Sequence, residues 1–212
     1  MKPLPGSLRE AWAGHISAED YERHMAAVGQ AEANASLLEE LFRDHAPPAG
    51  GRILFAGAGA GQCFDYFAPA VIAAYRATFT DINPAYLDRL AERLSGCDIS
   101  IAVDDIEDSR LKGPFDLAIA ILVLEHVDWR RAVASLARRA GRVFAVIQRN
   151  PAVLPPRPLP GTLGVLHEVR MALLDPAELT AAFAREGFRL TRTGGRDVLD
   201  GKTMLALDFS RG

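Results

Sequence analysis

The chain has 212 residues and a formal net charge of −3, with 49% hydrophobic and 24% charged residues. This length suits one α/β domain with a full core and a small lid, and it does not favour two independent domains. The charge argues against a nucleic-acid-binding surface and favours a small-molecule partner. The sequence has no run of about 18 apolar residues and no apolar signal segment, which predicts a cytoplasmic protein without a membrane span.

Residues 1–49 are expected to form a helical extension or lid in front of a main domain at 50–212. Prolines and glycines before Ser17 predict little regular structure in that part of the chain. Ser17, followed three residues later by Asp20, predicts the N-cap and a weak capping box of a helix that ends near Val28. Gly29 then separates this helix from a second one, which ends before the prolines and glycines at 47–51.

From residue 52 onward, short apolar segments alternate with helical patterns. Strands are expected at about 52–56, 77–81, 99–103, 115–122, 142–148, 188–193 and 203–209. Helices are expected at about 61–73 with a break at Pro69, after the caps Asn83 and Asp128, and from Asp175 to Gly187. Between them, Pro151 to Pro160 holds five prolines and is expected to be an extended loop. Alternating strands and helices that end in a hairpin, expected through Gly194 and Gly201, indicate a mostly parallel sheet with one antiparallel strand.

Three alternate glycines, Gly57, Gly59 and Gly61, follow the first strand. They remove every second Cβ from the turn, so a ligand can approach the backbone closely, and a helix start there would favour an anionic group. A dinucleotide fingerprint needs a glycine at the sixth position, where this chain has Gln62. An NAD(P)-dependent oxidoreductase is therefore a less favoured alternative, and the chain also lacks a Tyr-x-x-x-Lys pair.

Acidic residues end the second and third expected strands. Asp81 lies about 20 residues past the glycine turn, where a carboxylate can accept both hydroxyl groups of a ribose. Asp105, beside Ile106, could accept the exocyclic amine of an adenine. Because Asn83 already suits the cap of the following helix, we expect Asp81 to be available for a ligand at the carboxyl ends of the strands.

Three sequence blocks together resemble the class I S-adenosylmethionine-dependent methyltransferases that act on small molecules. The blocks are the G-x-G-x-G turn, Phe115-Asp116-Leu117 with Leu124-Glu125-His126-Val127, and the Leu-x-x-x-Phe-x-x-x-Gly-Phe pattern at 179–188. The resemblance covers about residues 52–209. It implies a Rossmann-like fold with a seven-stranded sheet in the order 3-2-1-4-5-7-6, an antiparallel last strand and helices on both faces. It also implies S-adenosylmethionine as cofactor and methyl transfer to an oxygen or nitrogen of a small-molecule acceptor by in-line displacement.

The resemblance implies a set of site residues around the glycine turn and the strand ends. The expected cofactor-binding residues are Gly57, Ala58, Gly59, Gly61, Gln62, Asp81, Ile82, Asp105, Ile106 and Leu122. The candidate acceptor-binding residues are Tyr21, His24, Met25, His126 and Arg149. His126 is a possible general base, and Arg149 would suit an acidic acceptor. No metal ligands are expected, catalytic residues stay open, and the protein is expected to be a monomer or homodimer.

Phe55 departs from the family pattern. The family usually has an acidic residue two places before the first glycine, and that carboxylate supports the methionine end of the cofactor. Asp65 or a residue of the N-terminal segment could substitute for it, and Gln30 and Asn34 could reach the cofactor's carboxylate. The departure motivates a second alternative, a protein that binds the cofactor but is a catalytically inactive regulator or partner.

Overall fold

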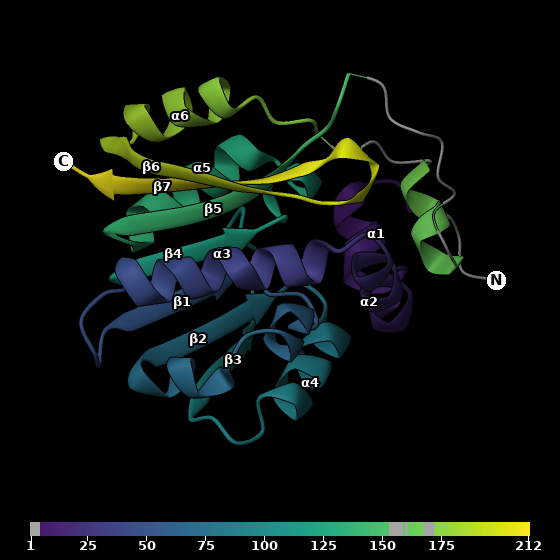
Figure 1. Ribbon diagram of the computed structural model, residues 1–212, viewed down its shortest axis with the longest axis horizontal. Coiled ribbons are helices and arrows are strands. Elements are labelled where there is room, and N and C mark those ends of the chain that lie inside the picture. The colour runs from purple at the N-terminus through teal and green to yellow at the C-terminus, as the bar shows by residue number, and fades with distance from the viewer. Residues whose placement is uncertain (1–4, 153–158, 160, 168–171) are drawn as a thin grey trace.

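A seven-stranded sheet organises the computed structural model, which describes residues 5–152, 159, 161–167 and 172–212. The strand order is β3-β2-β1-β4-β5-β7-β6, and β7 runs antiparallel to both of its neighbours, β5 and β6, while the other pairs are parallel. This order and the single reversed strand confirm the expected Rossmann-like fold. Figure 1 shows helices on both faces of the sheet.

The strands are β1 (Arg52–Ala56), β2 (Arg76–Asp81), β3 (Ile99–Val103), β4 (Leu117–Ile121), β5 (Arg142–Arg149), β6 (Phe188–Asp197) and β7 (Thr203–Arg211). The α-helices are α1 (Leu8–Gly14), α2 (Ala18–Ala27), α3 (Gln30–Asp44), α4 (Pro84–Arg93), α5 (Trp129–Arg139) and α6 (Pro176–Arg185). Short 3₁₀ helices are η1 (Gln62–Asp65), η2 (Pro69–Ala74), η3 (Leu124–His126), η4 (Gly161–His167) and η5 (Leu199–Gly201). Within the described residues, none of the helices is both long and apolar enough to cross a membrane.

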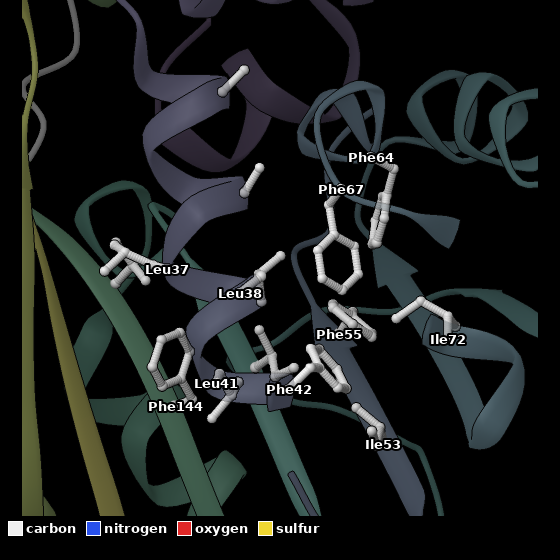
Figure 2. Packing of buried hydrophobic residues seen from close by; sticks show 14 of the residues in the cluster. Leu37, Leu38, Leu41, Phe42, Ile53, Phe55, Phe64, Phe67, Ile72 and Phe144 are labelled. Atoms are coloured by element: carbon white, nitrogen blue, oxygen red, sulfur yellow. The ribbon is translucent and has the colours of Figure 1, made fainter. Parts of the chain in front are cut away.

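The core consists of two layers, one on each face of the sheet. Side chains alternate along a strand, so Ile53 and Phe55 face α3, whereas Leu54 and Ala56 face α5. Figure 2 shows α3 laid across the first face, where its leucines and Phe42 pack over the aromatic side chains of β1 and the following turns. Because β1 is buried on both faces, its carboxyl end and the glycine turn are fixed by packing on either side.

Side-chain caps start three of the helices as expected. Asn83 accepts from the N–H of Ala85, Asp128 accepts from the next turn of α5, and Asp175 accepts from the N–H of Ala177. In each case a side-chain oxygen satisfies a backbone N–H that has no partner within the helix. The Ser17 cap of α2 is confirmed in the same way, since its hydroxyl accepts from the N–H of Asp20.

The expectation of little regular structure before Ser17 is wrong, because α1 lies there. Ser7 accepts a hydrogen bond from the N–H of Glu10 at 3.2 Å, and the Glu10 carboxylate accepts one from Gly6 at 2.7 Å. This Ser-x-x-Glu arrangement resembles a capping box, except that Glu10 bonds the residue before the N-cap. Prolines that precede the N-cap do not oppose such a helix, since they lie outside its hydrogen-bonded turns.

The expected helix at 61–73 is also wrong, because the chain forms η1 and η2 there instead. Gly61 has a φ of +72°, which ends any continuous turn on its N-terminal side, and Pro69 has no N–H to continue η1. The two short 3₁₀ helices are what remains between these residues. The glycine turn therefore leads into an irregular segment and not into a long α-helix with a dipole.

The start of β4 and the end of β6 also differ from the expectation. Phe115 forms an isolated bridge with Ala140, so β4 begins only at Leu117. β6 continues through Gly194 to Asp197, and the hairpin turns at η5. The expected loop at Pro151–Pro160 falls largely on residues 153–158 and 160, which are outside the described residues.

Candidate functional site

The structural reason for glycine differs among the three glycines of the turn. All three have positive φ values, of 66°, 59° and 72°. A side chain at Gly57 would collide with Val123, and one at Gly61 would lie 3.2 Å from Leu90, so close packing inside the protein explains both. Gly59 faces Tyr21 and the Oε1 of Gln62, both at ordinary contact distance, and lines a cavity. The close approach of a ligand is therefore possible at Gly59 and at the neighbouring backbone of Gly57, but not at Gly61.

Asp81 fixes this turn against the end of β2. Its two carboxylate oxygens accept hydrogen bonds from the N–H of Gly59 and the N–H of Asn83, both at 2.9 Å. Asp81 is only 9% exposed, and burial raises the pKa of its carboxyl, although the backbone hydrogen bonds oppose that shift. The carboxylate lines the same cavity as Gly59.

We call this cavity the strand-end cavity, because the ends of β1, β2 and β4 and the chain that follows β3 surround it. Of the expected cofactor residues, it is lined by Gly57, Gly59, Asp81, Ile82, Asp105, Ile106 and Leu122. Two apolar side chains, Ile82 and Ile106, provide contact area for a flat ring. Asp105 is already paired, since its carboxylate accepts from Arg9 Nε at 3.0 Å and from the N–H of Glu107 at 3.0 Å.

Leu122 directly follows β4 and has a left-handed conformation, with a φ of +52°. A non-glycine residue in this region carries backbone strain, and such strain concentrates at functional sites. The Leu122 N–H still donates to the Val146 carbonyl at 2.8 Å, so β5 holds the strained residue in place. Its side chain lies between the strand-end cavity and a second cavity.

An aromatic cluster from α1, α2, α4 and η3 separates these two cavities. Tyr21 stacks on Tyr86 with ring centroids 5.8 Å apart, and Trp12 packs edge-on against both Tyr21 at 5.2 Å and His126 at 4.6 Å. The Tyr86 hydroxyl donates to the carbonyl of Ile16. Trp12 and Tyr86 were not expected at the site, because α1 was not predicted and Tyr86 has no motif of its own.

The second cavity lies under α1, α2 and η4, and we call it the cap cavity. It has a volume of about 220 Å³. Its lining includes the apolar residues Trp12, Tyr21, Met25, Leu122, Leu159, Leu163 and Leu166 and the polar residues His24, Gln30, Glu125, His126, Gln148, Asn150 and Lys202. Four of the candidate acceptor-binding residues, Tyr21, His24, Met25 and His126, thus line one cavity. Arg149 is exposed and is not among the described residues that line this cavity.

Glu125, His126 and Tyr21 line the cap cavity and have large pKa shifts, and burial raises the pKa of Tyr21. Burial raises the pKa of Glu125 to about 7, and burial lowers the pKa of His126 to about 4. Glu125 Oε1 accepts from the N–H of Gln148 at 2.6 Å, whereas Oε2 and the Nδ1 of His126 are buried and have no hydrogen-bond partner among the described residues. Perturbed, unpaired groups that border a cavity are candidates for contact with a ligand.

A third, smaller cavity of about 40 Å³ lies on the other side of the glycine turn, and we call it the aromatic cavity. It is lined by Tyr21, Met25, Asn34, Phe55, Ala56, Gly57, Ala58, Gln62, Phe64, Ile119 and Ile121. Tyr21 lines all three cavities. The expected cofactor residues Ala58 and Gln62 therefore belong to a different cavity from Asp81, and the two cavities meet at Gly57 and Tyr21.

The helices α1 and α2 lie over the cap cavity, and we call them the cap. Asp20 of α2 connects the cap to η4. The Asp20 carboxylate accepts hydrogen bonds from the backbone N–H of Thr162 at 2.8 Å and from its hydroxyl at 2.7 Å. The same hydroxyl accepts from the N–H of Ser17 at 2.9 Å. These bonds, first of all the backbone bond, lower the pKa of Asp20. Leu163 and Leu166, which follow Thr162, are thereby held over the cap cavity.

Thr162→Val is expected to loosen this connection, since it removes the hydroxyl that bonds both Ser17 and Asp20. We expect the hydrogen of the Ser17 N–H to exchange with solvent about three to ten times faster, because the variant loses hydrogen bonds of ordinary strength. Amide hydrogen exchange followed by NMR measures this rate. Thr162→Ser keeps the hydroxyl and serves as the control. Equal exchange rates in both variants would show that the hydroxyl does not hold the cap.

The matched family and the similar structures agree with this geometry. Residues 53–143 match the family model described as a methyltransferase domain. Magnesium protoporphyrin IX methyltransferase (ChlM) from Synechocystis PCC 6803 with bound SAH has a TM-score of 0.63 and 18% identity, over 92% of this chain and 84% of that chain. A TehB-like SAM-dependent methyltransferase from Corynebacterium glutamicum ATCC 13032 has a TM-score of 0.60 and 22% identity, over 92% and 98%.

The same fold occurs in the [4+2]-cyclase SpnF, with a TM-score of 0.65 and 13% identity over 84% of this chain and 81% of that chain. At these identities the solved structures establish the fold alone. No curated protein matches the chain in sequence. The match of residues 53–143 to a methyltransferase domain and the fold of the described residues both agree with the expected class I methyltransferase family.

Proposed function

We propose that the protein transfers the methyl group of S-adenosylmethionine to an oxygen or nitrogen atom of a small molecule held in the cap cavity. The observation that carries this proposal is the meeting of three cavities at Tyr21. A nucleoside bound in the strand-end cavity and an amino-acid chain bound in the aromatic cavity would join beside the cap cavity. The cofactor, when bound, supplies a methyl group that is already electrophilic, so the protein needs mainly to align the acceptor.

The residues of the strand-end cavity fit an adenosine group. Asp81 has carboxylate oxygens that can accept ribose hydroxyls, and the Gly59 backbone has no side chain to prevent a close approach. Ile82 and Ile106 are placed to pack on the two-ring base. Asp105 can accept a base amine with the lone pairs that Arg9 and Glu107 leave free. Arg9 then ties α1 to the same carboxylate.

The cap cavity fits an acceptor that is mostly apolar and carries an N–H or O–H donor. Leucine and aromatic side chains supply the apolar contact, and the buried, unpaired Glu125 Oε2 is available to accept a hydrogen bond. With a pKa raised to about 7, Glu125 can also take up the proton that an amine or hydroxyl loses when it is methylated. In this proposal residues 1–49 form the lid, residues 50–212 form the catalytic domain, and α3 fixes the lid to the sheet.

Binding of S-adenosylhomocysteine tests the cofactor site without knowledge of the acceptor. A ligand at about 100 times its dissociation constant adds roughly 2.7 kcal/mol of stability, so the unfolding midpoint should rise by about 5–10 °C. Asp81→Asn is expected to lower the affinity for S-adenosylhomocysteine at least about tenfold. The two oxygens of Asp81 each accept from a backbone N–H group, and asparagine would replace one of these oxygens with an N–H₂ group that cannot accept. Asp88→Asn, on the exposed side of α4, is the control. A midpoint shift with NAD⁺ or NADP⁺ alone would overturn the proposal.

Phe55 supports the second candidate function, a protein that binds the cofactor without turnover. Release of S-adenosylhomocysteine in the presence of a panel of small amines, phenols and carboxylic acids separates the two candidates. Turnover with any member of the panel supports the methyltransferase. Tight binding together with no turnover across the panel would favour the regulatory protein.

A further inference from the structure

The aromatic cavity offers no charge to a ligand. Every residue that lines it is uncharged at neutral pH, although the cavity is larger than the roughly 10–15 Å³ that a water-sized group requires. Phe55 contributes an aromatic side chain that is 4% exposed and stacks on Phe79 with centroids 4.4 Å apart. A cationic group that enters this cavity must therefore find neutral hydrogen-bond acceptors.

Asp65 does not supply the missing carboxylate. Its two oxygens pair with Arg93, at 2.7 Å to Nε and 3.2 Å to Nη2. The Asp65 side chain is 53% exposed and is not among the described residues that line the cavity. Arg93 also pairs with Glu22 at 3.0 Å, so this network of ion pairs joins α4 to α2. None of its three residues is among the described residues that line the cavity.

Two buried amide oxygens of the cavity have no partner. Asn34, on α3, is 2% exposed, and Gln62, at the start of η1, is 9% exposed. Among the residues that the structure describes, the Oδ1 of Asn34 and the Oε1 of Gln62 accept no hydrogen bond. Proteins rarely leave buried acceptors unsatisfied, because such a group loses its water without a replacement. Two such oxygens from separate elements, bordering one cavity, indicate a ligand group with several N–H donors.

We propose that Asn34 Oδ1 and Gln62 Oε1 bind the α-ammonium group of the cofactor, in a subsite built from amides where a carboxylate would be expected at position 55. This inference rests on the proposed function. An ammonium group has three N–H donors and no acceptor, so it complements amide oxygens and not amide N–H₂ groups. Hydrogen bonds from a charged donor are also stronger than those between neutral groups. Gln62 lines the aromatic cavity together with Tyr21, so its side chain lies beside the N-terminal helix α2.

The amide subsite also suits a protein that must exist without its cofactor. A buried carboxylate with no partner is far more costly than an unpaired amide, because a charge loses more hydration. Neutral acceptors therefore permit Phe55 and its aromatic neighbours to pack densely against α3 (Figure 2). The protein is therefore expected to bind ligands with the α-ammonium group more tightly than ligands without it. This preference should depend on Asn34 and Gln62 and not on an ionisable acid.

Calorimetric titration with three probes tests the inference. The probes are S-adenosylhomocysteine, its analogue in which hydrogen replaces the α-amine, and 5′-methylthioadenosine, which lacks the amino-acid end. The wild-type protein is expected to bind S-adenosylhomocysteine at least about tenfold more tightly than the deamino analogue. Asn34→Leu, which is nearly isosteric, should remove that preference and leave the affinities for the other two probes within about twofold. Gln62→Met should act in the same direction, and Glu39→Gln on the exposed side of α3 should change nothing.

Two results would overturn the inference. The first is equal weakening of all three probes by Asn34→Leu, which would indicate a structural effect. The second is an unchanged preference for S-adenosylhomocysteine in both amide variants. A wild-type protein that binds none of the probes would instead overturn the proposed function, and binding of all three with equal affinity would overturn the ammonium subsite alone.

Discussion

Phe55→Asp is expected to destabilise the protein by about 4 kcal/mol or more, although it restores the acidic residue of the family pattern. Truncation of a buried phenylalanine side chain typically costs about 3–5 kcal/mol. The aspartate would also place an unpaired charge among aromatic side chains, since Phe55 stacks on Phe79 and contacts the edge of Phe64. Because whole domains have only about 5–15 kcal/mol of stability, this change removes a large part of it.

Urea denaturation measures the loss, and Phe55→Leu is the matched control. Leucine keeps an apolar side chain in the cluster, so we expect its cost to stay below about 3 kcal/mol, within the range for core changes that preserve polarity. An aspartate variant as stable as the leucine variant would contradict this account. It would show that the carboxylate finds a partner, and the amide subsite would then be unnecessary.

Phe55 also shows what the sequence could and could not predict. The pattern around it identified the strand, the turn and the family, because β1 is a short apolar run buried on both faces. The sequence also identified the substitution itself. It named Asn34 only as a residue that could reach the cofactor's carboxylate, since Asn34 lies on α3, more than twenty residues before the turn, and an asparagine on a helix carries no local signal of which group it binds.

The N-terminal cap was predictable only in part. The capping box of α2 gave a local signal, and so did the one of α1, which was outweighed by the nearby prolines. The position of Trp12 between two cavities depends on contacts with Tyr21, Tyr86 and His126, from three other elements. Tertiary contacts of this kind have no periodicity in the sequence, so the wall between the cavities could not be derived from it.

The glycine turn shows a different limit of sequence patterns. Three alternate glycines suggested three points of ligand approach, but two of them make room for Val123 and Leu90. Close packing inside the protein and close approach of a ligand both require glycine, so the two causes give the same sequence pattern. Only the structure shows that Gly57 and Gly59 border the strand-end cavity and that, of these two, Gly59 alone has no side chain packed close against it.

Glu125→Gln is expected to increase the stability at pH 8 by up to about 3 kcal/mol and to have little effect near pH 4.5. The folded-state pKa of about 7 lies above the ordinary value of 4.5. The stabilising contribution of the protonated carboxyl is therefore complete below pH 4.5 and is lost as the pH rises through about 7. A difference of about 2.5 pKa units corresponds to roughly 3 kcal/mol. Glutamine stays neutral and can still accept from the N–H of Gln148.

His126 shifts the stability in the opposite direction. Its folded-state pKa of about 4 lies below the ordinary 6.5, so its contribution is present above pH 6.5 and is lost as the pH falls through about 4. Between about pH 4.5 and 6.5 the two neighbouring residues oppose each other in the wild-type protein. Glu125→Gln removes one of them, and its stability should then fall steadily on acidification through that range.

Urea denaturation of the wild-type protein and the variant at pH 5, 6, 7 and 8 measures both effects. The stability difference between them should grow with pH, whereas the exposed Glu39→Gln should give a difference that does not change. A constant difference for Glu125→Gln would mean that Glu125 ionises without penalty in the folded protein. Its carboxylate would then have a partner in the cap cavity, and it could not serve as the neutral-pH proton acceptor that the proposed reaction assigns to it.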